Sequence, residues 1–249
     1  VDRMSGKRIA VAPFVRDSGS KEIISGGYIF PGPGELFTVE WELPHVDFAI
    51  DEAGLLVTNF DKEKYLGHLY LHEYSITGKR KFHIQFRDEQ HEFQGLTRCS
   101  AVGGAWALED NGLRVITRDD FHLFSGPYYT EDSTTGCKLV PEYGESHLLV
   151  VRSRGIESGY YFGLHGKGKV ALLKRDHSLT VLKEVDYLWE LNRQITLEIT
   201  ASGQTIVCRV DGKEIIYYTD RGALPYGMAG VAKLSGGRTL FMSLSTAEL

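Results

Sequence analysis

The stretch ITLEITASGQTIVCRVDGKEIIYYT, residues 195–219, decides the fold class. Apolar and polar residues alternate on both sides of Ala201-Ser202-Gly203 and again on both sides of Asp211-Gly212, which is the period of a half-buried β-strand. An Asp-Gly pair between alternating runs is the strongest short signal of a β-hairpin, because both central residues of a type I′ turn need positive φ. The stretch therefore predicts three consecutive antiparallel strands.

Strand-like runs separated by turn residues continue on both sides of this stretch. The strands predicted around it are 146–153, 160–164, 169–175, 179–185, 227–234 and 238–245. No long window carries the apolar stripe of an amphipathic helix. Short, regularly spaced strands are typical of a sandwich or jelly roll, so the chain is predicted to be all-β and antiparallel.

The first third of the chain repeats this style with a different sequence. Its predicted strands are 8–15, 26–30, 36–44, 53–60 and 66–76. In 36–44, apolar residues occupy the odd positions from 37 to 43, as in a strand with one buried face. The most charged stretch is 78–95, and we place a domain boundary inside it. The prediction is two antiparallel β-sandwich domains, a small one at 1–88 and a jelly roll at 89–249.

Composition excludes several classes of partner. The 249 residues include 42% hydrophobic ones, enough for a core, and 28 Lys+Arg against 33 Asp+Glu give a net charge of −5. This acidic balance predicts neither a nucleic-acid partner nor binding to an anionic membrane. No apolar run reaches the roughly 18 to 20 residues of a membrane span. The N-terminal segment lacks a signal-peptide pattern, and a chain that starts at Val1 is expected to be a piece of a longer protein.

The chain has three cysteines, Cys99, Cys137 and Cys208, at wide spacing and without a CxxC pair. The odd count favours three buried thiols in a reducing compartment, which predicts a cytoplasmic location, although one disulfide remains an alternative. A zinc site is not expected.

No residue of the chain is assigned a catalytic role. Glu184, Asp186 and Glu190 resemble the ExDxE strand of jelly-roll glucanases, in which one Glu is the nucleophile and another the general acid. Here Leu188 occupies the position that the third carboxylate needs. The nucleophile elbow GxSxG is absent, and the Gly-rich segments lie between strands as turns rather than before a helix. Trp189 and Leu191, beside these acids, are predicted to fill the core where the chain crosses between sheets.

Histidine metal sites are not indicated either. His68 and His72 share one face of a predicted strand but lie about 13 Å apart, which is too far for one metal. A calcium ion held by carboxylates and backbone carbonyls remains an open expectation, with no residues assigned to it.

Tyrosine is the residue type that suggests a ligand. The chain has 13, and a tyrosine ring suits the apolar face of a sugar while its hydroxyl end remains polar. We expect Arg152 and Arg154 to share a strand face, with the next strand beside them. The candidate ligand-binding residues are Arg152, Arg154, Tyr160, Tyr161 and His165. The alternative is structural: one tyrosine of each pair packs inward and the other lies on the sheet surface.

Three segments of the second half carry a family resemblance: YYFGL…GKVALLKR (160–175), WEL…ITLEI (189–199) and VDGKEI followed by LPYGMAGVA (210–232). Residues 145–249 look like a concanavalin-like, laminin-G-like jelly roll of the type found in carbohydrate-binding modules and keto-disaccharide-hydrolase-like domains. The resemblance implies this fold. It implies a ligand only weakly, because the sandwich hosts many functions.

The preceding segment, ELFTVEWELP…AGLLVTN…GHLYLHEYSITG (35–78), is similar to a second small β-sandwich. This tandem order resembles the C-terminal region of some bacterial ADP-ribosylglycohydrolase-like proteins, in which a helical catalytic domain with a metal-binding acidic cluster comes first. No helical domain of that kind is present in the sequence, so its activity is carried over to no residue here.

The expected function is a non-catalytic, lectin-like region that binds an oligosaccharide or glycan as an accessory to a larger bacterial hydrolase. One alternative is a structural module that docks onto a catalytic domain of the ADP-ribosylglycohydrolase type. A freestanding glycoside hydrolase is the other alternative, and it would need two carboxylates roughly 5 to 10 Å apart in one groove.

Overall fold

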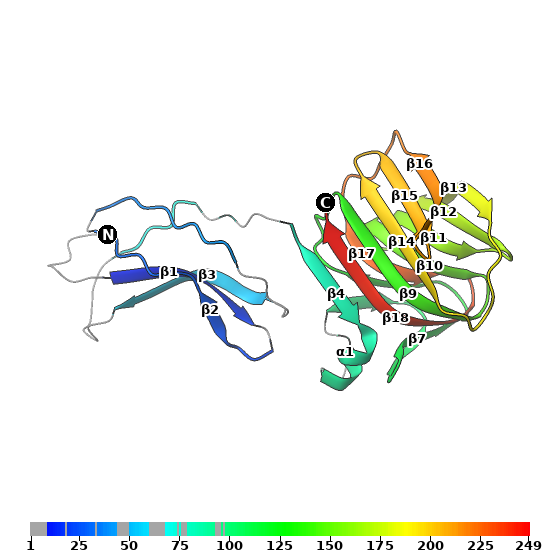
Figure 1. Ribbon diagram of the computed structural model, residues 1–249, viewed down its shortest axis with the longest axis horizontal. Helices are drawn as coiled ribbons and strands as arrows, with labels where there is room; N and C mark the ends of the chain where they lie inside the picture. The colour runs from blue at the N-terminus through cyan, green and yellow to red at the C-terminus, as the bar shows by residue number, and fades with distance from the viewer. Residues whose placement is uncertain are drawn as a thin grey trace. The chain divides into compact units, whose positions relative to one another are not determined.

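We describe the fold from a computed structural model (Figure 1). The structure describes residues 9–17, 19–32, 34–43, 50–59, 68–73, 75, 79–92, 96 and 98–249. The chain divides into two compact units, Val1–Ile76 and Thr77–Leu249. Each unit is considered by itself below.

The described strands of the first unit form one antiparallel sheet in the order β2-β1-β3. Its strands are β1 (Ile9–Asp17), β2 (Ile23–Ser25) and β3 (Ile50–Asn59). A second sheet, which the predicted small sandwich needs, is not formed by the described residues of this unit.

The prediction of a strand at 36–44 is wrong over its described part, 36–43, which joins no β-ladder. Burial nevertheless alternates along it, with the odd positions half-buried and the even positions exposed. The hydrophobic pattern thus indicated which side chains are covered, but a strand also needs a hydrogen-bonded neighbour, which the pattern does not report. Residues 68–73 likewise form no strand, whereas the rest of the predicted run 66–76, apart from residue 75, lies outside the described residues.

The boundary between the units falls earlier than residue 88, where the sequence placed it. Strand β4 (Lys81–Gln85) pairs with β18 (Gly237–Glu248), with Ile84 opposite Leu244. Ile84 and Phe86 are buried in the core of the second unit. Residues 81–86 therefore belong to the second unit, and the charged stretch conceals a core strand.

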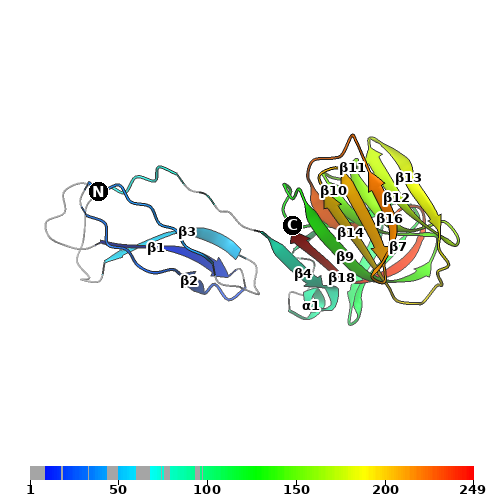
Figure 2. The ribbon, with the colours of Figure 1, turned by 45° about the horizontal axis from the view of Figure 1, so that its top comes forward.

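The second unit is a sandwich of two antiparallel sheets, seen one behind the other in Figure 1 and from a second angle in Figure 2. The seven-stranded sheet contains, in spatial order, β13 (Ser178–Asp186), β12 (Lys169–Asp176), β11 (Ser158–His165), β10 (Ser146–Ser153), β17 (Met228–Lys233), β8 (Phe121–Ser125) and β5 (Cys99–Val102). The eight-stranded sheet contains β16 (Lys213–Thr219), β15 (Thr205–Val210), β14 (Ile195–Ser202), β9 (Ser133–Tyr143), β18, β7 (Gly112–Thr117) and β6 (Ala105–Glu109), with β4 beside β18. The one helix among the described residues is the short α1 (Phe86–Glu92).

The main core lies between these two sheets. Leu149, Phe162 and Leu172 of the seven-stranded sheet belong to the same buried cluster as Ile199 and Phe241 of the eight-stranded sheet. Every second residue of a strand faces inward, so the alternation in the sequence becomes this layer. The all-β, antiparallel prediction is confirmed.

The predicted hairpin at Asp211-Gly212 is confirmed in detail. Asp211 has φ 48° and Gly212 has φ 79°, and Val210 pairs with Lys213 across the turn. The strands on either side, β15 and β16, lie where the alternation predicted them. This turn therefore fixes the register of the hairpin, because its two positive φ angles suit the residues that occupy it.

The cysteines are free thiols, with Cys137 and Cys208 buried and Cys99 partly buried. Trp189 packs against the core near His147, as predicted, with their ring centroids 5.8 Å apart. Leu191 does not fill the core, because it is 45% exposed.

Candidate functional site

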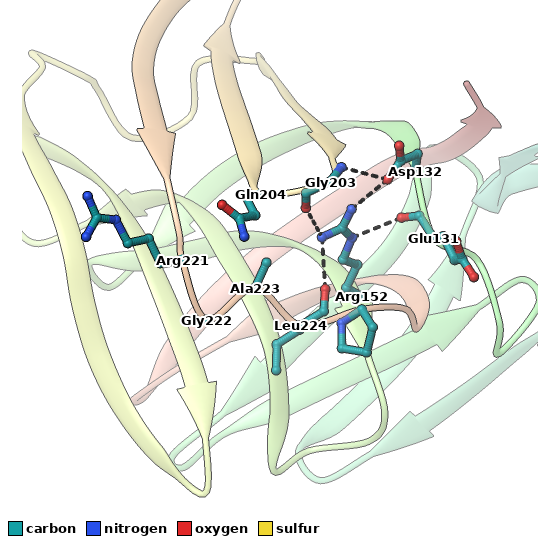
Figure 3. A pocket seen from close by; sticks show the side chains of 10 residues that line it. Glu131, Asp132, Arg152, Gly203, Gln204, Arg221, Gly222, Ala223 and Leu224 are labelled. Atoms are coloured by element: carbon teal, nitrogen blue, oxygen red, sulfur yellow. Dashed lines mark hydrogen bonds and ion pairs between the residues drawn. The ribbon is translucent and has the colours of Figure 1, made fainter.

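A pocket of about 280 Å³ opens at one end of the sandwich (Figure 3). Three segments form its walls: residues 131–132 before β9, residues 203–204 in the turn between β14 and β15, and residues 221–225 after β16. Arg152, near the end of β10, lies between them. The pocket therefore combines loops from one sheet with a side chain from the other.

Arg152 binds all three walls at once. Its Nε donates to the Glu131 carbonyl at 2.9 Å, and its Nη1 donates to the carbonyls of Gly203 at 2.8 Å and Leu224 at 2.9 Å. Its Nη2 donates to Oδ1 of Asp132 at 2.9 Å. The planar guanidinium is suited to such a task, because its five N–H groups point in fixed directions.

A bulge in β10 places Arg152 in this position. The pairing of β10 with β17 shifts register between Val150 and Ser153, and Arg152 has φ 49°. Its side chain is only 3% exposed, whereas Arg154 is exposed. The expectation that Arg152 and Arg154 share a strand face is therefore wrong, because a bulge interrupts the two-residue period.

Asp132 is held as a charged acceptor. Besides Arg152, its carboxylate accepts hydrogen bonds from the Gly203 N–H at 2.8 Å and the Ser202 hydroxyl at 2.9 Å. Burial acts to raise the pKa of Asp132, but these hydrogen bonds and the charge of Arg152 outweigh it and lower the pKa. A general acid in glycoside hydrolysis needs the opposite shift, so Asp132 is fitted to support the pocket rather than to protonate a leaving group.

Buried side chains also fasten the wall formed by residues 221–225. The Tyr160 hydroxyl donates to Oδ2 of Asp220 at 2.6 Å and accepts from the Leu224 N–H at 3.0 Å. Lys174 adds an ion pair to Asp220 at 2.8 Å and donates to the Gly222 carbonyl. Burial and the bond to Asp220 raise the pKa of Tyr160, so the phenol stays protonated and remains a donor. The pocket wall is thus anchored before any ligand arrives.

Three side chains of the pocket lining are available to a ligand. Arg221, Gln204 and Glu131 are exposed, and within the described part of the chain none of their side-chain polar atoms has a hydrogen bond or ion pair. They offer a fork of donors, an amide with donor and acceptor, and a carboxylate acceptor. In Figure 3 they lie on different sides of the pocket, with Arg221 and Glu131 pointing away from Arg152, so a polar molecule that contacts all three has to span the pocket.

Beside the pocket lies a surface group of three aromatic residues, Tyr128, Tyr129 and Tyr226, which we call the tyrosine cluster. The ring centroids are 5.1 Å apart for Tyr128 and Tyr129, and 5.2 Å apart for Tyr129 and Tyr226. The guanidinium of Arg154 lies 5.8 Å from the centroid of Tyr226, within the range of a cation–π contact.

Of the five residues predicted as a site, the structure brings Arg152 and Tyr160 together, because both hydrogen-bond Leu224. Arg152 and Tyr160 are buried and hold the backbone of the pocket wall at Leu224, whereas Arg154 contacts the tyrosine cluster. Tyr161 faces away from the main core, in a second buried cluster, and His165 lies about 17 Å along β11 from Tyr160. The sequence gives the type of residue but not which tyrosines are exposed.

Neither Tyr160 nor Tyr161 presents a ring to solvent, since both are 0% exposed. The stacking surface expected from this pair is therefore not formed, and the alternative that one of the two lies on the sheet surface is wrong as well. Tyr161 is covered by Arg175, whose guanidinium lies 5.7 Å from the ring centroid, and burial raises the pKa of Tyr161 to about 12. His165 is half-buried, and burial lowers its pKa.

Sequence reasoning missed Arg221, Gln204 and Glu131. The signal that points to this wall is the turn-forming segment DRGALPY (220–226), which lies between the predicted strands 213–219 and 227–234. The acidic group Glu184, Asp186 and Glu190 is not one strand row, because β13 ends at Asp186 and Glu184 is paired with Lys169.

Two further features are absent from the described residues. No group of three or more His, Cys, Asp or Glu side chains that could hold a metal ion occurs among them. Within the same residues, no helix is long and apolar enough to cross a membrane.

Comparison with solved structures places the fold. The chain is similar to the carbohydrate-binding module CBM66 from Bacillus subtilis, with a TM-score of 0.54 and 19% identity over 59% of this chain and 92% of that one. A Bacillus subtilis protein of unknown function with a galectin-like fold gives a TM-score of 0.54 at 10% identity, over 67% of this chain and 96% of that one. A native glycosidic hydrolase gives 0.53 at 8% identity, over 69% and 97%.

No protein-family model matches the sequence, and no curated protein matches it significantly. At these identities the structural likeness shows the fold alone: a β-sandwich of the carbohydrate-binding-module and galectin-like kind. Because this fold supports both binding and catalysis, the argument for function depends on the site.

Proposed function

We propose that the chain is a non-catalytic carbohydrate-binding module whose site is the pocket between residues 131–132, 203–204 and 221–225. The observation that carries the proposal is the contrast between the two arginines of this pocket. Arg152 is buried and fully engaged in holding the walls, whereas Arg221 is exposed and has no partner among the described residues. A preformed polar pocket whose lining side chains still have hydrogen-bond donors and acceptors without partners among the described residues suits sugar hydroxyls, because the pocket loops need little ordering when the sugar binds.

Several features support binding over catalysis. The Asp132 carboxylate already accepts hydrogen bonds from three groups, and its lowered pKa does not suit a general acid. The likeness to a carbohydrate-binding module and to a galectin-like fold agrees with sugar binding at the level of the fold. The concanavalin-like character of the jelly roll rests on the sequence resemblance.

The test is calorimetric titration of the full chain with D-glucose, D-galactose, D-mannose and D-fructose and with linear oligomers of each, with and without calcium. We expect saturable binding by at least one series, lost at least tenfold in Arg221→Ala and in Gln204→Ala. Arg193→Ala is the matched control, because Arg193 is an exposed arginine at the opposite end of β14 from the pocket. Loss in the control as well, or no binding in the whole panel, would contradict the proposed site.

Calcium enters the proposal only through this titration. If calcium strengthens binding, backbone carbonyls contribute to its oxygen ligands, because no group of three or more acidic or histidine side chains among the described residues could hold it. If it has no effect, sugar binding by the pocket is independent of the ion.

The wider context, an accessory region of a larger bacterial hydrolase of the ADP-ribosylglycohydrolase type, is proposed from the tandem resemblance alone. A specific observation also favours docking to such a partner as a second candidate function. The first unit exposes large apolar side chains, with Leu36 at 84%, Tyr70 at 75% and Leu71 at 63%. Exposed apolar residues in numbers are typical of interaction surfaces.

Docking is tested separately from sugar binding. The full chain is titrated with a recombinant helical ADP-ribosylglycohydrolase domain, and Leu36→Ser and Leu71→Ser are compared with the unchanged chain. Binding weakened by these substitutions supports docking, and absence of any association contradicts it.

A further inference from the structure

The tyrosine cluster exposes large aromatic rings to solvent, where folding gains little from them. Tyr129 is 67% exposed and Tyr128 is 41% exposed, although each carries a large apolar ring. The three ring centroids lie 5.1 to 5.9 Å from one another, and Tyr226 is half-buried. Aromatic rings with polar ends gathered at the surface are typical of recognition sites, since they supply rigid contact area at low entropic cost.

The cluster is continuous with the pocket along two separate chain segments. Tyr129 is two residues from Glu131, and Tyr226 directly follows Pro225, both of which line the pocket. The Gly227 N–H donates to the Thr130 carbonyl at 2.9 Å and joins the two segments side by side. A molecule that fills the pocket and extends along these two segments therefore reaches the cluster.

The cluster is also held in place. The Thr130 hydroxyl, on a residue only 5% exposed, donates to the Pro127 carbonyl at 3.1 Å and so closes the turn that carries Tyr128 and Tyr129. Arg154 lies over Tyr226 and occupies part of one ring. These contacts fix the rings without using the exposed surface of Tyr129, which is the most exposed of the three.

We propose that the tyrosine cluster is a second subsite, which holds the sugar residue next to the one in the pocket. This inference rests on the proposed function. The pocket supplies hydrogen bonds to one residue, and Tyr129 supplies a ring against which the apolar face of the next residue stacks. The ligand class is accordingly an oligosaccharide or glycan chain of at least two residues rather than a free monosaccharide.

The test compares a monosaccharide with the di- and trisaccharide of whichever series from the panel binds, by calorimetry on the full chain. We expect the disaccharide to bind about tenfold more tightly than the monosaccharide, because stacking its second residue on the Tyr129 ring adds about 1.4 kcal/mol of binding free energy. Tyr129→Ala should remove that gain and leave monosaccharide binding unchanged. Tyr129→Phe should keep the gain, because the ring face remains.

Tyr143→Ala is the matched control. Tyr143 is 68% exposed, close to the exposure of Tyr129, and lies at the far end of β9 from the pocket. It should leave binding of every sugar unchanged. Circular dichroism and the melting temperature of each variant, unchanged for these exposed positions, show that a loss of binding is not a loss of folding.

The outcomes separate the two proposals. Equal affinity for monosaccharide and disaccharide, or a gain that survives in Tyr129→Ala, overturns the second subsite while the pocket stands. Disaccharide binding lost in Arg221→Ala and reduced to the monosaccharide level in Tyr129→Ala supports both. No binding by any member of the panel overturns the proposed function and the subsite with it.

Discussion

Replacing Arg152 by methionine tests whether the pocket is held together by one buried guanidinium. The substitution keeps an unbranched apolar chain but removes every hydrogen bond to the carbonyls of Glu131, Gly203 and Leu224 and the ion pair with Asp132. Each buried acceptor left unsatisfied costs about 1–3 kcal/mol, whereas the ion pair contributes less than a fully buried one because the Asp132 side chain is 43% exposed. Water in the open pocket replaces part of these bonds. We therefore expect the free energy of unfolding to fall by about 3–5 kcal/mol.

The assay is equilibrium unfolding in urea, followed by tryptophan fluorescence. The chain has three tryptophans, and changing Trp41 and Trp106 to phenylalanine leaves Trp189, which packs against the core of the second unit. In this background the signal reports the unit that contains Arg152. Arg193→Met is the matched control, and as an exposed substitution it should change stability by no more than about 0.5 kcal/mol.

Arg152→Lys refines the result. Lysine keeps the charge but is a single point donor that cannot reach all the walls, so we expect a loss of about 1–3 kcal/mol, between the wild type and Arg152→Met. If Arg152→Met unfolds within about 1 kcal/mol of the wild type, the guanidinium does not hold the walls, and the reasoning that separates Arg152 from Arg221 fails.

Three further predictions concern the second unit. Burial lowers the pKa of His122 to about 4 and of His147 to about 3, so below about pH 6.5 the unfolded chain binds more protons than the folded chain. The free energy of unfolding should therefore fall as the pH drops from 6.5 toward 4, by up to about 1.4 kcal/mol per pH unit for each histidine. Urea midpoints measured against pH check this, and His147→Gln should show a shallower fall. Gly212→Ala should lower the free energy of unfolding by about 1 kcal/mol through its φ of 79° alone, since the added Cβ meets nothing within 4 Å. Gly222→Ala, whose φ lies outside the left-handed region, should lower it by less, and an equal loss in both variants would refute the turn argument. The three thiols should react with Ellman's reagent only after unfolding, because burial raises their pKa, and rapid reaction of the native protein would contradict this.

The strands of the second unit could be predicted because their signals are local. Alternation with a period of two marks a half-buried strand such as β16, and a short continuous apolar run marks a strand buried on both faces such as β10; both begin and end where these patterns put them. Asp211-Gly212 fixed its turn for the same reason, since the φ angles are a property of these two residues. The segment 36–43 shows the limit: its burial alternates as predicted, but pairing requires a neighbour that the segment itself does not encode.

The site depended on the tertiary structure throughout. Arg152 is predicted from the sequence to bind a ligand from an exposed strand face, but a bulge in β10 buries its side chain among the pocket walls. Tyr160 and Tyr161 were expected at the surface and are buried, whereas the exposed Tyr129 owes its position to a turn closed by Thr130.

The sequence by itself thus determined the fold class, most strand positions of the second unit and its central hairpin, all of which follow from side-chain periodicity and backbone preference. Only the tertiary structure decided that residues 131–132, 203–204 and 221–225 meet, since they are far apart in the chain and are joined by the hydrogen bonds of Arg152. It also decided which arginine is buried among hydrogen-bond partners, Arg152, and which is exposed, Arg221, because burial and partners are properties of the folded chain.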